Sequence, residues 1–294
     1  MTELNSVIEE VRRSTDEFLL HHLADRDPDI DPVYRAMRYS ACAGGKRIRP
    51  LLVVLVSDML GGDREAALRL GCAIEMIHTY SLIHDDLPCM DDDDLRRGQP
   101  TCHRAFDEAT ALLAGDALLT EAFSVVADAP MTDCQRIKAV KKLTDAASAG
   151  GMIGGQIMDL AAEKSFVAKV ESLKKLQSLK TGALIRASVF LGMISANNQD
   201  PIVEKALDKY AENIGLAFQI IDDYLDRFAD EQTLGKPIGS DEKNGKTTFL
   251  TFMTPGEALG YAGQLTKEAK AAVLSISHSE LLVDLAEALL ERRS

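Results

Sequence analysis

The sequence lacks the cysteine pattern of a disulfide-stabilised or zinc-stabilised protein. Its five cysteines are odd in number, and none of them forms a Cys-x-x-Cys pair. Reduced thiols are therefore expected. A zinc site at Cys89, Cys102 and His103 is the weaker alternative to packed or surface thiols.

Positive charge and long apolar segments are also scarce. The formal net charge is −13 and the calculated pI is about 5.0, which argues against a protein that coats nucleic acid or an anionic membrane. No apolar run reaches the roughly eighteen residues of a membrane span, and no apolar segment follows a basic start at the N-terminus. We therefore expect a cytoplasmic protein that binds neither nucleic acid nor membrane.

Strand-like alternation, a Walker pattern and Gly-x-Gly-x-x-Gly are all missing, whereas apolar residues recur at helical spacing. Hydrophobic residues make up 46% of the chain, enough for a substantial core. We predict an all-α fold in which residues 1–294 form one large single-domain helical bundle. The expected helices span residues 4–25, 33–42, 50–60, 64–83, 109–127, 133–160, 167–180, 182–196 and 202–227, with two more after 255.

An acidic stretch follows the expected helix at 64–83. Six aspartates lie within the ten residues from Asp85 to Asp94, and Arg96 and Arg97 come directly afterwards. Taken alone, such a run would be interpreted as a solvated loop. Because the preceding helix is mostly apolar, the first carboxylates should instead lie at the end of a buried helix, where they need a counter-ion.

A second acidic group lies inside an apolar helix far downstream. Asp222, Asp223 and Asp226 are three and four residues apart, so one helical face should present several carboxylates. An exposed acidic turn is a poor explanation, because Ile221 and Leu225 lie among them. Oxygen ligands of this kind suit Mg²⁺, which prefers carboxylates, waters and substrate phosphates.

Basic residues occur in several short polar turns beside Gly or Thr. A cation and free backbone N–H groups in such a turn can hold a phosphate oxygen. Each turn alone is an ordinary surface feature, but two acidic groups and several basic turns in one apolar bundle together describe a diphosphate site. The basic residues are Lys46, Arg49, Arg96, Arg97, Lys180, Lys236 and Lys246.

These motifs resemble those of the short-chain trans-prenyl diphosphate synthases. Asp85-Asp86-x-x-x-x-Asp91, followed by Leu95-Arg96-Arg97-Gly98, is similar to the first aspartate-rich motif of the bacterial and plant members, and Asp222-Asp223-x-x-Asp226 is similar to the second. The resemblance covers nearly the whole chain and implies an isoprenoid synthase fold with helices around a central cavity. Further similar motifs are Gly44-Gly45-Lys46-Arg47-x-Arg49-Pro50, His78, Gly154-Gly155-Gln156-x-x-Asp159, Lys180-Thr181-Gly182 and the turn at 235–247.

The resemblance also implies the ligands of the site. Three Mg²⁺ ions would bind an allylic diphosphate, and Mn²⁺ is the alternative ion. The implied metal ligands are Asp85, Asp86, Asp91 and Asp222, supported by Asp92, Asp223 and Asp226. The implied contacts are Arg96, Lys180, Lys236 and Lys246 for the allylic diphosphate, and Lys46, Arg49, His78 and Arg97 for isopentenyl diphosphate. For His78, a packed core histidine is the alternative.

The implied reaction is ionisation of the allylic diphosphate followed by formation of a carbon–carbon bond. Cations stabilise the departing diphosphate, and an apolar cavity keeps water from the allylic cation. Thr181 and Gln219 would stabilise that cation beside Lys180. The double bond of isopentenyl diphosphate then attacks, and the released pyrophosphate takes the final proton, so no side chain serves as nucleophile.

Tyr80 should control the length of the product. It precedes Asp85 by five residues, about 7.5 Å deeper along a helix, and by the resemblance an aromatic residue there accompanies the fifteen-carbon product, farnesyl diphosphate. Geranyl and geranylgeranyl diphosphate are the alternatives within the family. A terpene cyclase would need neither Gly45-Lys46-x-x-Arg49 nor the second aspartate motif, and a non-catalytic synthase subunit would have lost aspartates that are present here. The family also pairs as homodimers, so a second copy is the expected protein partner.

Overall fold

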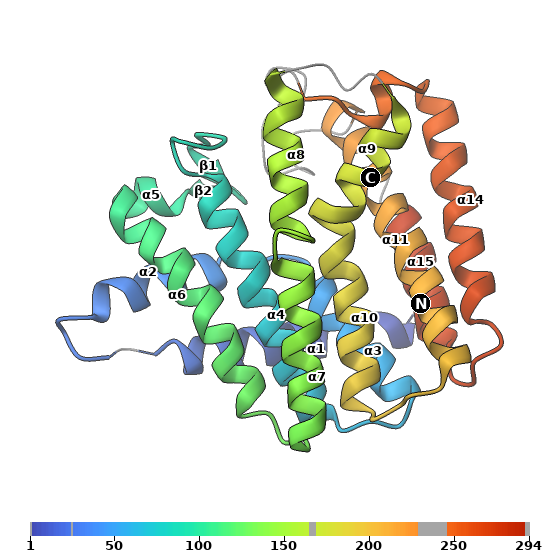
Figure 1. The fold of residues 1–294 in the computed structure, drawn as a ribbon, viewed down its shortest axis with the longest axis horizontal. Helices are drawn as coiled ribbons and strands as arrows, with labels where there is room; N and C mark the ends of the chain where they lie inside the picture. Colours follow the sequence, from blue (N-terminus) through green and yellow to red (C-terminus); the bar gives the residue numbers. More distant parts are fainter. Residues whose placement is uncertain (1, 25, 165–168, 229–245, 292–294) are drawn as a thin grey trace.

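The computed structural model describes residues 2–24, 26–164, 169–228 and 246–291 of the chain, and most of its helices stand side by side in one bundle (Figure 1). The prediction of an all-α fold is confirmed. The first half comprises α1 (Thr2–His22), α2 (Asp31–Ala41), α3 (Ile48–Met59), α4 (Arg64–Asp85), β1 (Leu95–Arg96), β2 (Gln99–Pro100), α5 (Cys102–Ala105), α6 (Glu108–Ala127) and α7 (Asp133–Ala147). The second half comprises α8 (Met152–Lys164), α9 (Val170–Gln177), the π-helical turn η1 (Ser178–Gly182), α10 (Ala183–Ser195), α11 (Pro201–Phe228), the 3₁₀ turn η2 (Phe249–Thr251), α14 (Pro255–Val273) and α15 (Glu280–Glu291).

Side-chain caps fix the start of the central helices. The Asp63 carboxylate accepts a hydrogen bond from the Ala66 N–H at 2.7 Å at the start of α4. Asp107 accepts one from the Thr110 N–H at 2.8 Å at the start of α6. Each cap satisfies an N–H group that has no partner within its helix.

Helix α4 is the centre of the bundle and packs against both α3 and α6. It is buried on several sides, at Leu70, Ile74 and Ile77 among others, as its mostly apolar sequence predicts. Among the described helices, only α6 is long and apolar enough to cross a membrane. It lies along α4 and buries Ala114 and Leu118 against the bundle, as core helices do.

The expected single helix at 133–160 is wrong. Helix α7 ends at Ala147, a turn occupies residues 148–151, and α8 begins at Met152, so the two helices lie end to end (Figure 1). A Cβ at Gly151 would lie 2.2 Å from the Ala146 carbonyl oxygen, so glycine permits the turn. The glycines at this point mark a break in the helix.

A short hairpin was also not predicted. β1 pairs with β2 in antiparallel register, with Arg96 opposite Gln99. The two turn residues Arg97 and Gly98 have φ values of 54° and 76°, as a tight hairpin turn requires. This turn places Arg96 and Arg97 at the edge of the acidic loop.

The C-terminal ends of α4 and α11 lie at the same end of the bundle, the upper end in Figure 1. Both aspartate motifs belong to these two helix ends. The fold therefore brings two acidic segments together although more than a hundred residues separate them in the sequence.

Candidate active site

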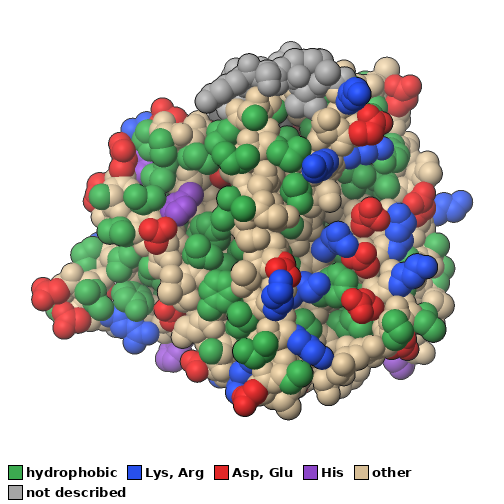
Figure 2. Space-filling view, in the orientation of Figure 1, with side chains coloured by type: hydrophobic (Ala, Val, Ile, Leu, Met, Phe, Trp, Pro, Cys, Tyr) green, Lys and Arg blue, Asp and Glu red, His purple; other side chains and the backbone are tan. Residues whose placement is uncertain are grey.

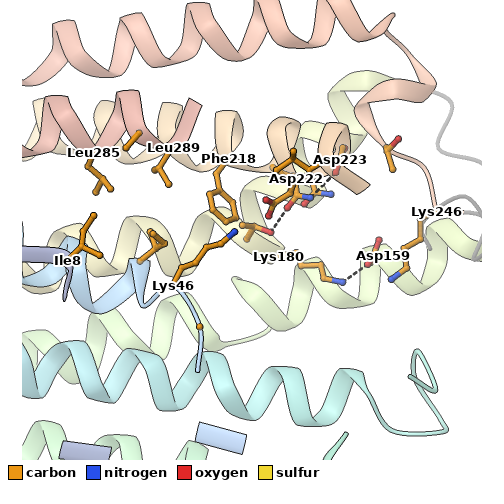
Figure 3. A pocket seen from close by; sticks show the side chains of 18 of the residues that line it. Ile8, Lys46, Asp159, Lys180, Phe218, Asp222, Asp223, Lys246, Leu285 and Leu289 are labelled. Atoms are coloured by element: carbon orange, nitrogen blue, oxygen red, sulfur yellow. Dashed lines mark hydrogen bonds and ion pairs between the residues drawn. The ribbon is translucent and has the colours of Figure 1, made fainter. Parts of the chain in front are cut away.

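Two cavities meet at the π-helical turn η1 and helix α11. The first, of about 760 Å³, has a polar end and an apolar end, the latter near Ile8, Leu285 and Leu289 (Figure 3). The second, of about 750 Å³, lies among α4, α6, α8 and α11 and is mainly apolar. The residues that line both are Lys180, Thr181, Phe218, Gln219 and Asp222.

Asp85 lines the second cavity together with Asp222. It is the last residue of α4, and burial raises its pKa to about 6, against the opposing effect of Lys180. No described side chain donates a hydrogen bond to this carboxylate. The Asp85 carboxylate is half-buried. Because its pKa is raised despite Lys180, the described basic residues do not fully compensate its negative charge.

Asp86 is bound to Arg96. The Arg96 Nε donates to both carboxylate oxygens, at 2.8 and 2.9 Å, and the Asp86 side chain is only 4% exposed. A bidentate pair of this kind orients a guanidinium strongly. In this structure Asp86 determines where Arg96 lies.

The remaining acidic residues of the loop also have basic partners. The Asp91 carboxylate, 9% exposed, accepts from Lys246 Nζ at 3.1 Å. Arg104 donates to Asp94 at 2.6 Å and lies 3.6 Å from Asp92. Asp92 and Asp94 are thus held at the outer side of the loop, while Asp91 faces the turn that carries Lys246.

The aspartates of the second motif differ in their surroundings. Asp222 lines both cavities. Asp223 accepts from Gln219 Nε2 and from the backbone N–H of Phe249, each at 2.9 Å. Asp226 is buried and lines neither cavity. Helical spacing alone does not distinguish these three environments.

The π-helical turn η1 presents Lys180 and Thr181 to both cavities. Lys180 Nζ lies 2.5 Å from the Asp159 carboxylate on α8 (Figure 3), and Thr181 Oγ1 donates to Gln219 Oε1 at 3.0 Å. A Cβ on Gly155 would lie 2.2 Å from the Lys180 backbone nitrogen. Glycine at that position therefore allows α8 to approach η1.

Four basic residues, here called the basic wall, are Lys46, Arg49, His78 and Arg97. Arg97, like Arg96, lines neither of the two cavities. Arg97 donates to the Gly44 carbonyl oxygen, and a Cβ on Gly45 would lie 2.7 Å from the Arg97 guanidinium carbon. Burial lowers the pKa of Arg49, and burial together with the nearby Arg49 charge lowers the pKa of His78 well below its ordinary value. Arg49 and His78 both line the second cavity, whereas Lys46 lines the first.

Sequence reasoning missed the residue that anchors this wall. Arg47 has a left-handed backbone, with φ at 48°. Its buried guanidinium donates to Glu75 at 2.9 Å, to Asp16 at 2.6 Å and to the Ala41 carbonyl at 2.7 Å. The sequence gives no signal that separates Arg47 from its basic neighbours, because the distinction depends on helices far away in the chain.

Tyr80 lines the second cavity and is only 4% exposed. Burial, with a contribution from Asp85, raises the pKa of its phenol to about 12. Gln156 lines the same cavity. Of the predicted site residues, Lys236 falls within 229–245, outside the described residues.

The donor groups fit Mg²⁺ bound together with a substrate. Among the described residues, no three His, Cys, Asp or Glu side chains converge into a closed metal site. Mg²⁺ normally uses one or two carboxylates and completes its coordination with waters and substrate phosphates. The poorly neutralised Asp85 carboxylate, in the same cavity as Asp222, has the character of such a partial site.

The fold defines the class of protein. The chain superimposes on an FPP/GFPP synthase from Zymomonas mobilis with a TM-score of 0.90 and 40% identity, covering 98% of this chain and 99% of that one. It is 46% identical to a farnesyl diphosphate synthase of Escherichia coli, over 88% of this chain and 87% of the relative. It is 42% identical to a geranylgeranyl diphosphate synthase of Cyanophora paradoxa, over 89% and 88%. The polyprenyl synthetase family model matches residues 31–268. The chain belongs to the polyprenyl synthetase family and is a transferase.

Proposed function

We propose that this protein condenses isopentenyl diphosphate with dimethylallyl and geranyl diphosphate to form farnesyl diphosphate. The observation that carries the proposal is the second cavity, whose mainly apolar lining includes the carboxylates of Asp85 and Asp222 as well as Tyr80. A diphosphate fits the charged part, and a growing prenyl chain fits the apolar remainder. The named activities of the similar proteins support the same reaction.

The direct metal ligands in this proposal are Asp85, Asp91 and Asp222. When bound, Mg²⁺, as three ions, neutralises negative charge on the diphosphate oxygens and so makes the diphosphate a better leaving group; Mn²⁺ is the alternative ion. Lys246, which contacts one oxygen of Asp91, moves from that carboxylate to the substrate diphosphate when the cation binds. Asp86 acts by holding Arg96, and the predicted ligands Asp92 and Asp226 act at most through water.

The cationic side chains hold the allylic diphosphate as its C–O bond breaks. Arg96 is aligned by Asp86, and Lys180 and Lys246 approach from η1 and from the turn before η2. Lys236 is assigned to the same group by its motif alone. Gln219 directs its amide oxygen to Thr181 and its amide nitrogen to Asp223, so this hydrogen-bond chain fixes the dipoles nearest to the allylic cation.

Isopentenyl diphosphate occupies the basic wall. Lys46, Arg49, His78 and Arg97 bind its diphosphate. The lowered pKa of His78 keeps the ring neutral, so it contributes a hydrogen bond rather than a charge. The apolar lining excludes water, which would otherwise capture the cation.

The chain acts as a cytoplasmic homodimer with one polyprenyl synthase domain per protomer. Four large apolar side chains are exposed on neighbouring helices: Leu112 and Leu113 on α6 are 46% and 57% exposed, and Ile153 and Ile157 on α8 are 43% and 64% exposed. Hydrophobic side chains also gather over α6 and α8 in Figure 2. Leu112, Ile153 and Ile157 also line the second cavity, so the homodimer is proposed from the family resemblance and not from these side chains. Light scattering coupled to size-exclusion chromatography measures the mass in solution and tests whether two copies of the 32.0 kDa chain associate.

The reaction is tested by incubating purified protein with Mg²⁺, isopentenyl diphosphate and either dimethylallyl or geranyl diphosphate. We expect farnesyl diphosphate from both allylic substrates and no product with a chelator present. Cyclic hydrocarbons would identify a terpene cyclase. Absence of turnover would indicate a non-catalytic subunit, and a twenty-carbon product would correct the chain length alone.

A further inference from the structure

We infer that His84 positions the Tyr80 ring, and that Gly115 on α6 positions His84, so that these three residues together set the length of the product. The inference rests on the proposed function. His84 and Tyr80 are four residues apart on α4 and therefore neighbours on one helical face. Both line the second cavity.

The imidazole of His84 lies against the backbone of α6 at a glycine. A Cβ on Gly115 would lie 2.1 Å from Nε2 and 2.5 Å from Cδ2 of His84. His84 Nε2 also lies 3.0 Å from the Leu112 carbonyl oxygen and 3.9 Å from Asp116. Because a carbonyl oxygen only accepts, Nε2 carries a proton in this contact. The His84 ring can therefore occupy this position only because residue 115 has no side chain.

The other side of the imidazole meets Tyr80. The two ring centroids are 5.7 Å apart and the planes cross at 74°, an edge-to-face contact. The Tyr80 hydroxyl is buried and has no hydrogen-bond partner among the described residues. The phenol is therefore not fixed by its polar end, and its orientation depends on packing, to which His84 contributes directly.

Substitutions at His84 and at Gly115 should change the length of the product in opposite directions. Removing the imidazole with His84→Ala leaves space into which Tyr80 can turn, so the cavity becomes longer. Adding a methyl group with Gly115→Ala pushes the imidazole towards Tyr80, so the cavity becomes shorter. A general loss of stability would reduce activity in both variants without moving product length in opposite directions.

The experiment measures chain length by mass spectrometry, with Mg²⁺, geranyl diphosphate and isopentenyl diphosphate as probes. For His84→Ala we expect the ratio of twenty-carbon to fifteen-carbon product to rise about tenfold, the discrimination typical of small changes in an apolar pocket. For Gly115→Ala we expect condensation on geranyl diphosphate to fall about tenfold while condensation on dimethylallyl diphosphate persists. His84→Phe, which keeps a ring, should retain the fifteen-carbon product.

The double variant His84→Ala/Gly115→Ala tests the coupling. Without the imidazole the new methyl group meets no ring, so Gly115→Ala should no longer shorten the product. Gly260→Ala, where a Cβ meets open space, is the matched glycine control and should leave the product ratio unchanged. If His84→Ala does not fold, comparing Gly115→Ala with Gly260→Ala still tests the inference, because only Gly115→Ala should reduce condensation on geranyl diphosphate.

Folded, active His84→Ala and Gly115→Ala variants with the wild-type product ratio would overturn the inference and leave the proposed function intact. Shifts of the two single variants in the same direction would also overturn it, as would a double variant in which Gly115→Ala still shortens the product as much as it does alone. Wild-type protein that forms no prenyl diphosphate would overturn the proposed function, and this inference with it.

Discussion

Asp85→Asn should stabilise the protein while it abolishes catalysis. Burial raises the pKa of the Asp85 carboxyl from an ordinary 3.8 to about 6. At about 1.4 kcal/mol for each tenfold change in proton affinity, ionising this group in the folded state costs about 3 kcal/mol at pH 7. The isosteric amide carries no charge and avoids that cost, but it is a much weaker metal ligand.

The direction of the pH dependence follows from the raised pKa. Folding favours the protonated carboxyl, so this contribution to stability is complete below pH 3.8 and is lost as the pH rises through about 6. Urea unfolding between pH 4.5 and 7.5 measures the free energy of unfolding of both proteins. The excess of Asp85→Asn over wild type should increase with pH and reach about 3 kcal/mol at neutral pH, or roughly 6 °C in Tm.

The control is Asp145→Asn on the surface of α7, which removes only an exposed pair with Lys141 and should change stability by less than about 1 kcal/mol at any pH. An Asp85→Asn variant no more stable than wild type at pH 7, or a difference independent of pH, would refute the reasoning.

Three further predictions concern other contacts of the site. Asp86→Asn should reduce kcat/KM for the allylic substrate, because Arg96 loses the carboxylate that orients it; steady-state kinetics measure this, and wild-type kinetics would contradict the role given to this pair. Tyr80→Ala should extend the product to twenty carbons, as judged by mass spectrometry; an unchanged fifteen-carbon product would show that another residue limits the chain. Gly155→Ala should lower the free energy of unfolding by about 1–3 kcal/mol, since a Cβ there overlaps η1; equal stability of this variant and Gly260→Ala, in thermal melts, would contradict the close approach of α8.

The spacing of apolar residues predicts most of the helices. The two errors of prediction are the single helix at 133–160, which breaks at glycines, and the hairpin at 95–100, which was not expected. A glycine-rich segment such as 148–151 is compatible with a close helix contact and with a turn, and only the packed structure distinguishes them. The hairpin at 95–100 has strands of two residues each, too short for any alternation to be visible. Arg97-Gly98 was its one local signal.

The candidate site, like the fold, could be predicted only in part from the sequence. Motif spacing predicts a set of acidic and basic residues for the site, but not how they pair. Arg96 and Asp86 meet because a hairpin lies between them, and Arg47 points inward because its backbone is left-handed, whereas Lys46 beside it lines a cavity. Such distinctions arise from tertiary contacts that local sequence does not encode.

In the proposed reaction, Asp85, Asp91 and Asp222 hold a single diphosphate through divalent cations. Crystals grown with Mn²⁺ and a non-hydrolysable analogue of geranyl diphosphate test it by anomalous scattering. The account predicts manganese peaks between the diphosphate and these three carboxylates, with Lys246 withdrawn from Asp91. A diphosphate bound away from both aspartate motifs, or bound there without metal, would contradict it.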